Sequence, residues 1–246
     1  MTETSSRAAS VVQPESDGPD RRALKLMSAG FGLGSVGFML GAVMSMVTVP
    51  VLASVVAAAA GVFVVGAILF TCAAAVQWRT SVTHHPEFHS ARLHAESDLR
   101  NPDWLAAVIQ LVGTLYFNVM TLWALAVTPT TVANYNQHVW KPDVLGSLLF
   151  LISSLIACHP ISRARRHRLL NNGRSLAIVA ANLTGSILFG ISAIGSYAIP
   201  PGQERHPMWN NLGTLLGGLA FLVSAILVWP PARRSPAPTE PSPSPN

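Results

Sequence analysis

The sequence predicts an all-α, polytopic membrane protein whose six transmembrane helices form three tandem helical hairpins. Half of its 246 residues are hydrophobic and only 11% are charged, whereas about a quarter of the residues in a soluble domain are charged. Several stretches without Asp, Glu, Lys or Arg are long enough to cross a hydrocarbon layer of about 30 Å. A Gly-Phe motif recurs in the apolar stretches. Composition therefore predicts a membrane protein, and the repeated motif predicts the hairpins.

Six apolar segments, each bounded by charge, Pro or Trp, are the expected spans. The fourth is the shortest, because 144–158 reaches only about 22 Å as a helix. It must rely on its flanking residues or on a locally thinned bilayer, or else lie at the membrane interface. The expected helices are 26–48, 52–76, 104–127, 144–158, 175–199 and 209–229.

The segments between and beyond the spans complete the predicted organisation. The two tails are polar and lack apolar periodicity, so we expect them to be disordered. The predicted division is a cytoplasmic tail 1–23, hairpin 1 at 24–78, a His-containing cytoplasmic loop 79–103, hairpin 2 at 104–159, a basic cytoplasmic loop 160–174, hairpin 3 at 175–231 and a Pro-rich tail 232–246.

Charge placement predicts the orientation. Of the 16 Lys and Arg residues, only Lys141 and Arg205 fall on the second side of the predicted topology. Under the positive-inside rule, both termini are then cytoplasmic. The excess of Arg over Lys favours a bacterial source, and so the bacterial cell (inner) membrane. Because the basic residues adjoin apolar spans, the partner that they indicate is the lipid bilayer rather than nucleic acid.

The repeat is the most informative feature of the sequence. Each span has a glycine, a phenylalanine four residues later and, in most cases, small residues seven and eight positions after the glycine; Met120 breaks this pattern. The glycines are separated alternately by short and long gaps of 32, 47, 33, 39 and 32 residues, which pairs the spans into hairpins. The motif residues are Gly34 and Phe38, Gly66 and Phe70, Gly113 and Phe117, Gly146 and Phe150, Gly185 and Phe189, and Gly217 and Phe221.

These positions share one helix face at about 100° per residue. Small residues allow the close helix contacts that stabilise membrane bundles, so the face is interpreted as a packing stripe. An alternative is that the hydroxyl groups of Ser147, Ser153, Ser186 and Ser192 line a polar path. In the last span, Gly213 offers a rival register one turn before Gly217.

The hairpins, with Leu145-Gly146-Ser147-Leu148-Leu149-Phe150 and the similar run from Leu183 to Phe189, resemble the YrhK-like membrane domain. The similarity is clearest over about residues 104–229. It implies a small bacterial membrane module and supplies neither an established activity nor catalytic residues.

Gln110, Asn118 and Asn182 are the candidate polar cluster within the spans. Amides in a membrane commonly bridge helices, but an inward-facing group of three is also a candidate substrate or ion site. Asp143 follows Pro142, which indicates a first-turn carboxylate that stabilises the start of a helix.

The loop 79–103 contains His84, His85, His89 and His94, which are possible metal ligands or pH sensors. Their spacing matches no zinc motif, so a solvated loop is the simpler interpretation. The sequence also has no recognisable catalytic constellation, phosphate loop or thiol motif. We therefore expect no enzymatic activity, no metal site and no cofactor.

The leading functional hypothesis is a non-enzymatic module that packs through its small-residue stripe against itself, as a homo-oligomer, or against another membrane protein. The alternative is a small-solute or ion transporter or channel with a site near Gln110, Asn118 and Asn182. Repeats around an axis normal to the membrane would suit that alternative.

Overall fold

The computed structural model describes residues 21–47, 53–83, 102–127, 131–158 and 173–231. Six helical segments in this part are long and apolar enough to cross a membrane, which confirms the predicted fold class. They are α1 (Arg21–Val47), α2 (Ala53–Thr83), α4 (Pro102–Ala126), the segment from α5 (Val132–Tyr135) through η2 (Asn136–Trp140) to α6 (Lys141–Cys158), α8 (Gly173–Gly195) and α9 (Pro207–Val228).

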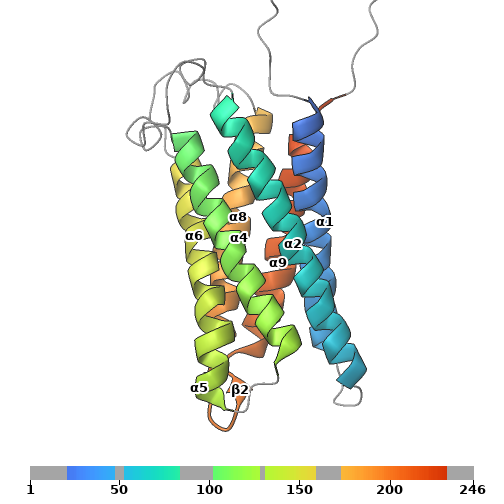
Figure 1. The fold of residues 1–246 in the computed structure, drawn as a ribbon, viewed down its shortest axis with the longest axis vertical. Helices are drawn as coiled ribbons and strands as arrows, with labels where there is room; N and C mark the ends of the chain where they lie inside the picture. Colours follow the sequence, from blue (N-terminus) through green and yellow to red (C-terminus); the bar gives the residue numbers. More distant parts are fainter. Residues whose placement is uncertain (1–20, 48–52, 84–101, 128–130, 159–172, 232–246) are drawn as a thin grey trace, which may run out of the picture.

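The spans form a closed ring. Helices paired in one hairpin pack together, namely α1 with α2, α4 with α6, and α8 with α9. The hairpins meet through α2 and α4, through α6 and α8, and through α9 and α1. Arg21, which begins α1, donates a hydrogen bond to the carbonyl of Pro231, which follows α9. The first and last spans therefore close the ring and begin and end at the same end of the bundle (Figure 1).

The fourth span begins earlier and is longer than the sequence predicts. Helix begins at Val132, where Thr131 accepts a hydrogen bond from the Asn134 amide, and the span Val132–Cys158 has 27 residues. Pro142 suggested a later start, because proline lacks an N–H and clashes with the preceding turn. The π-turn just before it, in which the Lys141 amide bonds to the Asn136 carbonyl, widens the helix there. Neither a thinned bilayer nor an interfacial position is needed.

Other boundaries also differ from the prediction. The first helix starts at Arg21, inside the predicted tail, and α2 continues to Thr83. Helix α8 ends at Gly195 rather than at 199, because the chain turns into a small antiparallel hairpin of β1 (Ala198–Ile199) and β2 (Gln203–Glu204). This hairpin lies at the end of the bundle away from Arg21 (Figure 1).

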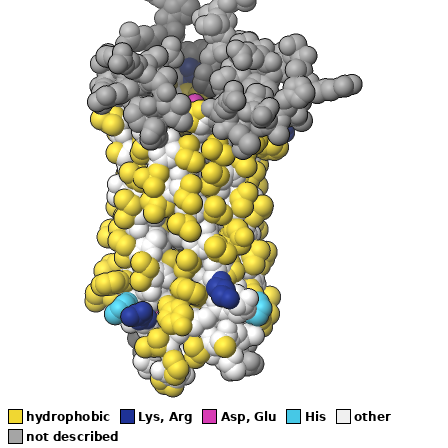
Figure 2. Space-filling view, turned by 90° about the vertical axis from the view of Figure 1, so that its left-hand side faces the viewer, with side chains coloured by type: hydrophobic (Ala, Val, Ile, Leu, Met, Phe, Trp, Pro, Cys, Tyr) yellow, Lys and Arg dark blue, Asp and Glu magenta, His cyan; other side chains and the backbone are white. Residues whose placement is uncertain are grey.

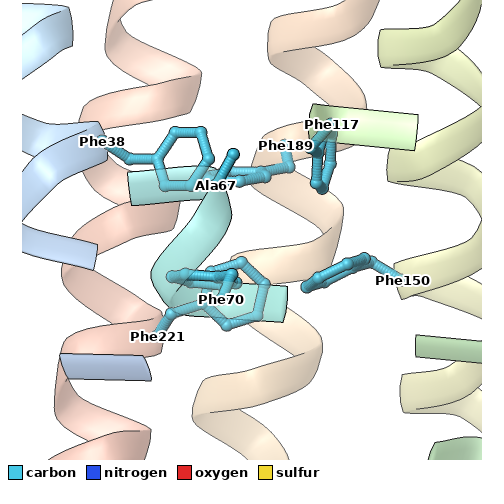
Figure 3. Close-up of a cluster of buried hydrophobic side chains, with 7 residues drawn as sticks. All are labelled: Phe38, Ala67, Phe70, Phe117, Phe150, Phe189 and Phe221. Carbon is cyan, nitrogen blue, oxygen red and sulfur yellow. The ribbon is translucent and has the colours of Figure 1, made fainter. Parts of the chain in front are cut away.

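The motif phenylalanines meet at the centre of the ring. Figure 3 shows them in two layers, with Phe38, Phe117 and Phe189 in one and Phe70, Phe150 and Phe221 in the other. Ring centroids lie 5.4 to 6.2 Å apart within the first layer and 5.7 to 6.1 Å apart within the second. The pairs within each hairpin are 5.1 to 5.3 Å apart. The three hairpins are therefore related by a pseudo-threefold axis along the bundle.

Each motif glycine makes room for a phenylalanine of its hairpin partner. A β-carbon at Gly185 would lie 2.9 Å from the Phe221 ring, and one at Gly217 would lie 2.5 Å from the Phe189 ring. The same exchange occurs in the other two hairpins. Gly217, not Gly213, is thus the equivalent residue in the last span. Apart from Met120, the stripe positions are buried inside the ring.

The outside of the ring is apolar. Large hydrophobic side chains such as Leu33, Val119 and Leu155 are more than half exposed. Figure 2 shows hydrophobic side chains over most of the long middle of one face, with Lys, Arg and His gathered toward its lower end. An apolar band between polar ends is the surface expected of a multi-pass membrane protein.

Candidate functional site

A large cavity occupies the interior of the ring at the end opposite Arg21. This distal cavity has a volume of about 860 Å³, and all six spans contribute to its lining. Phe38, Phe117 and Phe189, one layer of the aromatic cluster, form its floor. Gln203 and Arg205, which are exposed, line it too, so the cavity reaches the surface at that end.

A second, smaller cavity lies on the other side of the phenylalanines. This proximal cavity has a volume of about 150 Å³ and is again lined by residues of all six spans. Phe221, from the second aromatic layer, lies at its boundary. The two cavities are therefore on the axis of the ring, separated by two layers of phenylalanine.

Two carboxylates line the distal cavity. Asp143 Oδ2 accepts a hydrogen bond from Ser196 Oγ at 3.1 Å, and Glu204 Oε1 accepts one from Asn210 Nδ2 at 2.8 Å. Both donors are neutral. Within the described part of the chain, neither carboxylate forms an ion pair.

Burial raises the pKa of the Glu204 carboxyl above its ordinary value, and the hydrogen bond from Asn210 partly opposes this shift. Desolvation disfavours a charged group that has no counter-ion. The uncharged form of the Glu204 carboxyl is therefore favoured more than it is in an exposed glutamate.

Asp143 lies in the first turn of α6, as predicted, but it does not cap a free helix end. The helical segment begins earlier, at Val132, and runs to Cys158, so Asp143 lies within a continuous helical segment. Its side chain contacts Ser196, which follows α8, and lines the distal cavity. Pro142 was misleading because the π-turn allows proline inside this helix.

The wall beside Asp143 is held by contacts between the second and third hairpins. Asn136 pairs with the backbone of Ala198 through both its amide nitrogen (2.9 Å) and its amide oxygen (3.0 Å). Trp140 Nε1 donates to the Ala193 carbonyl at 2.9 Å. These bonds fix β1 and the end of α8 against the fourth span, and so fix the position of Ser196 opposite Asp143.

Two of the three predicted polar candidates lie together. Gln110 and Asn182 line the proximal cavity. Asn182 Nδ2 donates to Ser154 Oγ at 2.8 Å, and Gln110 Oε1 accepts from Ser153 Oγ at 3.4 Å. Ser28 Oγ, which also faces this cavity, is buried and has no hydrogen-bond partner among the described residues.

Asn118 does not join them. It lies between hairpins, where its Nδ2 donates to Thr71 Oγ1 at 2.6 Å, while its Oδ1 is buried without a partner in the described residues. It lines neither cavity.

Of the four serines that could line a polar path, two line a cavity and two join neighbouring helices. Ser153 lines the proximal cavity and Ser192 the distal one. Ser147 donates to the Phe189 carbonyl at 3.3 Å, and Ser186 bonds Ser154 at 2.8 Å, so both bridge α6 and α8.

The histidine loop, with His84, His85, His89 and His94, lies outside the described residues. Within the described ranges, no group of three or more His, Cys, Asp or Glu side chains is arranged to hold a metal ion.

The fold and cavities define a six-span membrane protein with three pseudo-equivalent hairpins around a central axis. No family model, curated protein or solved structure matches the chain. The resemblance to the YrhK-like domain stays a prediction.

Few features of the sequence indicate which residues surround the distal cavity. Tyr135, Asp143, Glu204 and Asn210 come from elements that are far apart in the chain or outside the predicted spans. One signal was present, because an acidic residue next to an apolar segment is a functional candidate in a membrane protein. Asp143 fits that description, although Pro142 before it also fits a helix start.

Proposed function

We propose that the protein carries a small solute across the membrane, with the distal cavity as its binding chamber and the phenylalanine cluster as a closed gate. The observation that supports this most directly is the alignment of two cavities on the axis of one helical ring. A helix bundle that served only for packing would have no need of a chamber of about 860 Å³ at its centre. Volumes of about 300–1,000 Å³ are usual for ligand sites.

The gate would act by excluding water and polar solutes. Phe38, Phe117 and Phe70 are 2% exposed or less, and hydrophobic constrictions close membrane pores by dewetting. Opening would require the hairpins to move relative to one another. Repeats around an axis normal to the membrane allow such rearrangement around a central site.

The proposal replaces the packing module as the leading hypothesis. The Gly-Phe stripe is buried inside the ring by contacts within each hairpin. Gly113, for example, packs against Phe150, and Gly146 packs against Phe117. It is therefore not presented to a homo-oligomeric or other membrane-protein partner. The proposed activity is non-enzymatic and uses no cofactor.

We further propose that the chain lies in a bacterial cell membrane with both termini cytoplasmic. The support is the charge bias under the positive-inside rule. In this orientation the distal cavity, with Lys141 and Arg205 near its end of the bundle, opens to the outside, and the proximal cavity faces the cytoplasm.

Solute flux tests the proposal. Proteoliposomes containing the full chain are exposed to hyperosmotic urea, glycerol or choline chloride, and vesicle reswelling is followed by stopped-flow light scattering. We expect at least one solute to enter faster than into protein-free vesicles. Replacing Phe117 and Phe150 together by Ala should open the gate and increase the rate for all three solutes.

The matched control carries Leu115→Ala and Leu148→Ala on the same two helices, at side chains that are 49% and 48% exposed on the outside of the ring. It should behave as the unaltered protein. Reswelling at the protein-free rate for every solute, in both the unaltered protein and a folded Phe117→Ala/Phe150→Ala variant, would overturn the proposal.

A further inference from the structure

We propose that the solute bound in the distal cavity is a small organic cation with an apolar portion. This inference rests on the proposed function in that it names the class of solute, but the binding site can be tested without any flux.

Charge is the first argument. Asp143, from the fourth span, and Glu204, from β2, both line the cavity, and each accepts its hydrogen bond from a neutral donor. Carboxylates inside a membrane protein are commonly paired with cationic groups, because an uncompensated charge is costly there. Neither has such a partner in the described ranges. A ligand cation would supply the missing charge.

The one basic residue in the described lining does not fill this role. Arg205 follows Glu204 directly, but its side chain is exposed and forms no ion pair with either carboxylate in the described part of the chain. The lining thus retains an excess of acidic groups. A bound anion would meet like charges, which selects against acidic solutes.

The floor and one wall provide the apolar half of the site. Phe38, Phe117 and Phe189 form the floor, and aromatic faces attract organic cations as well as apolar groups. Val56, Ala59, Phe63 and Met120 extend this surface along α2 and α4. A bare metal ion would gain nothing from these residues, whereas an alkyl or aryl ammonium ion could contact them and the carboxylates together.

The acidic groups and the apolar wall come from different elements around the same chamber. Asp143, Glu204 and Asn210 come from the fourth span, β2 and α9, and Ser196 follows α8, while the apolar wall comes from α2 and α4. A molecule with a charged end and an apolar end would therefore bind in one orientation. This asymmetry breaks the pseudo-threefold relation that holds at the phenylalanines, and it gives the chamber its chemical preference.

Binding of benzyltrimethylammonium tests the inference. Its affinity for the full-length protein in detergent is measured by isothermal titration calorimetry, beside phenylacetate and the uncharged analogue neopentylbenzene, which has the same shape as the cation. We expect saturable binding of the cation and weaker binding of the anion. Asp143→Asn and Glu204→Gln should each weaken cation binding about tenfold or more, because each removes a charge-assisted contact.

Asp103→Asn, which changes a carboxylate in the first turn of α4, is the matched control and should leave cation affinity unchanged. Unaltered binding of neopentylbenzene would show that the Asp143→Asn and Glu204→Gln variants keep a folded cavity. Equal affinity for cation and anion, or cation affinity insensitive to both cavity substitutions, would overturn the inference.

The two proposals fail separately. Solute flux without a preference for the cation would leave the carrier function standing and remove the inference about its solute. Carboxylate-dependent cation binding without flux would keep the site and remove the carrier function.

Discussion

The ring of Phe117 packs directly on Gly146, so closely that a β-carbon at Gly146 would lie 2.9 Å from Phe117 Cε1 and 3.1 Å from the Gly113 carbonyl. Backbone and aromatic ring thus meet across the second hairpin without an intervening side chain. The same contact recurs between Gly66 and the Phe38 ring in the first hairpin, at 3.4 Å.

Gly146→Ala should destabilise the protein by about 1–3 kcal/mol, which is the usual cost of adding an atom to a filled core. The melting temperature in detergent measures this effect. The control is Gly190→Ala in α8, where an added β-carbon has no atom within 4 Å; it should be neutral or slightly stabilising, because alanine favours helix. Equal melting temperatures for the two variants would contradict the role assigned to the motif glycine.

The repeat explains why the sequence predicted so much of this fold. A helix face that recurs in every span must bury against the same kind of partner each time, so the motif identified both the hairpin pairs and the buried phenylalanines. The fourth span was predicted too short because sequence periodicity does not reveal a π-turn. Pro142 reads as a helix start unless the turn before it is known to widen.

The distal cavity could not be predicted from the sequence, for a different reason. A cavity forms where side chains of neighbouring helices fail to meet, and this depends on helix crossing and on residues far apart in the chain. Phe63 and Asn210 line the same chamber, yet no spacing relates them. Gln110 and Asn182 line the same cavity and Asn118 does not, although all three are amide side chains within predicted spans.

Asn118 and Thr71 should be energetically coupled. Their hydrogen bond of 2.6 Å joins α4 to α2 across a boundary between hairpins. Asn118→Leu, Thr71→Val and the double variant form a cycle whose coupling free energy we expect to be about 0.6 kcal/mol and at most about 1.7 kcal/mol, as for other hydrogen bonds between membrane helices. Reversible unfolding in mixed micelles measures it. Strict additivity of the two single changes would mean that the bond does not stabilise the folded protein.

Met208 should be accessible from outside an intact bacterial cell. It lies at the start of α9, at the distal end of the bundle, and is 69% exposed. Met208→Cys, in a chain whose Cys72 and Cys158 are changed to Ser, should react with a membrane-impermeant maleimide before the cells are lysed. Ser81→Cys, near the C-terminal end of α2 and so at the opposite end of the bundle from Met208, should react only after lysis. The reverse pattern would contradict cytoplasmic termini.

Cation binding in the distal cavity should weaken as the pH falls. Burial raises the pKa of Glu204 above its ordinary value, which is about 4.3, so its charge is lost at a higher pH than that of an exposed glutamate. Because the protonated carboxyl no longer attracts a cation, the affinity for benzyltrimethylammonium should be highest above the raised pKa and should fall on passing below it. Calorimetric titrations at several pH values measure this dependence.

Glu204→Gln isolates the contribution of this group. The other ionisable groups that line the cavity in the described residues are Tyr135, Asp143 and Arg205, and His206 adjoins them in the chain. If Glu204 is responsible, the variant should bind the cation weakly with a flatter pH profile, because glutamine keeps an acceptor for Asn210 but has no proton to lose. A profile of unchanged shape in the variant would assign the titration to another of these groups and contradict the role of Glu204.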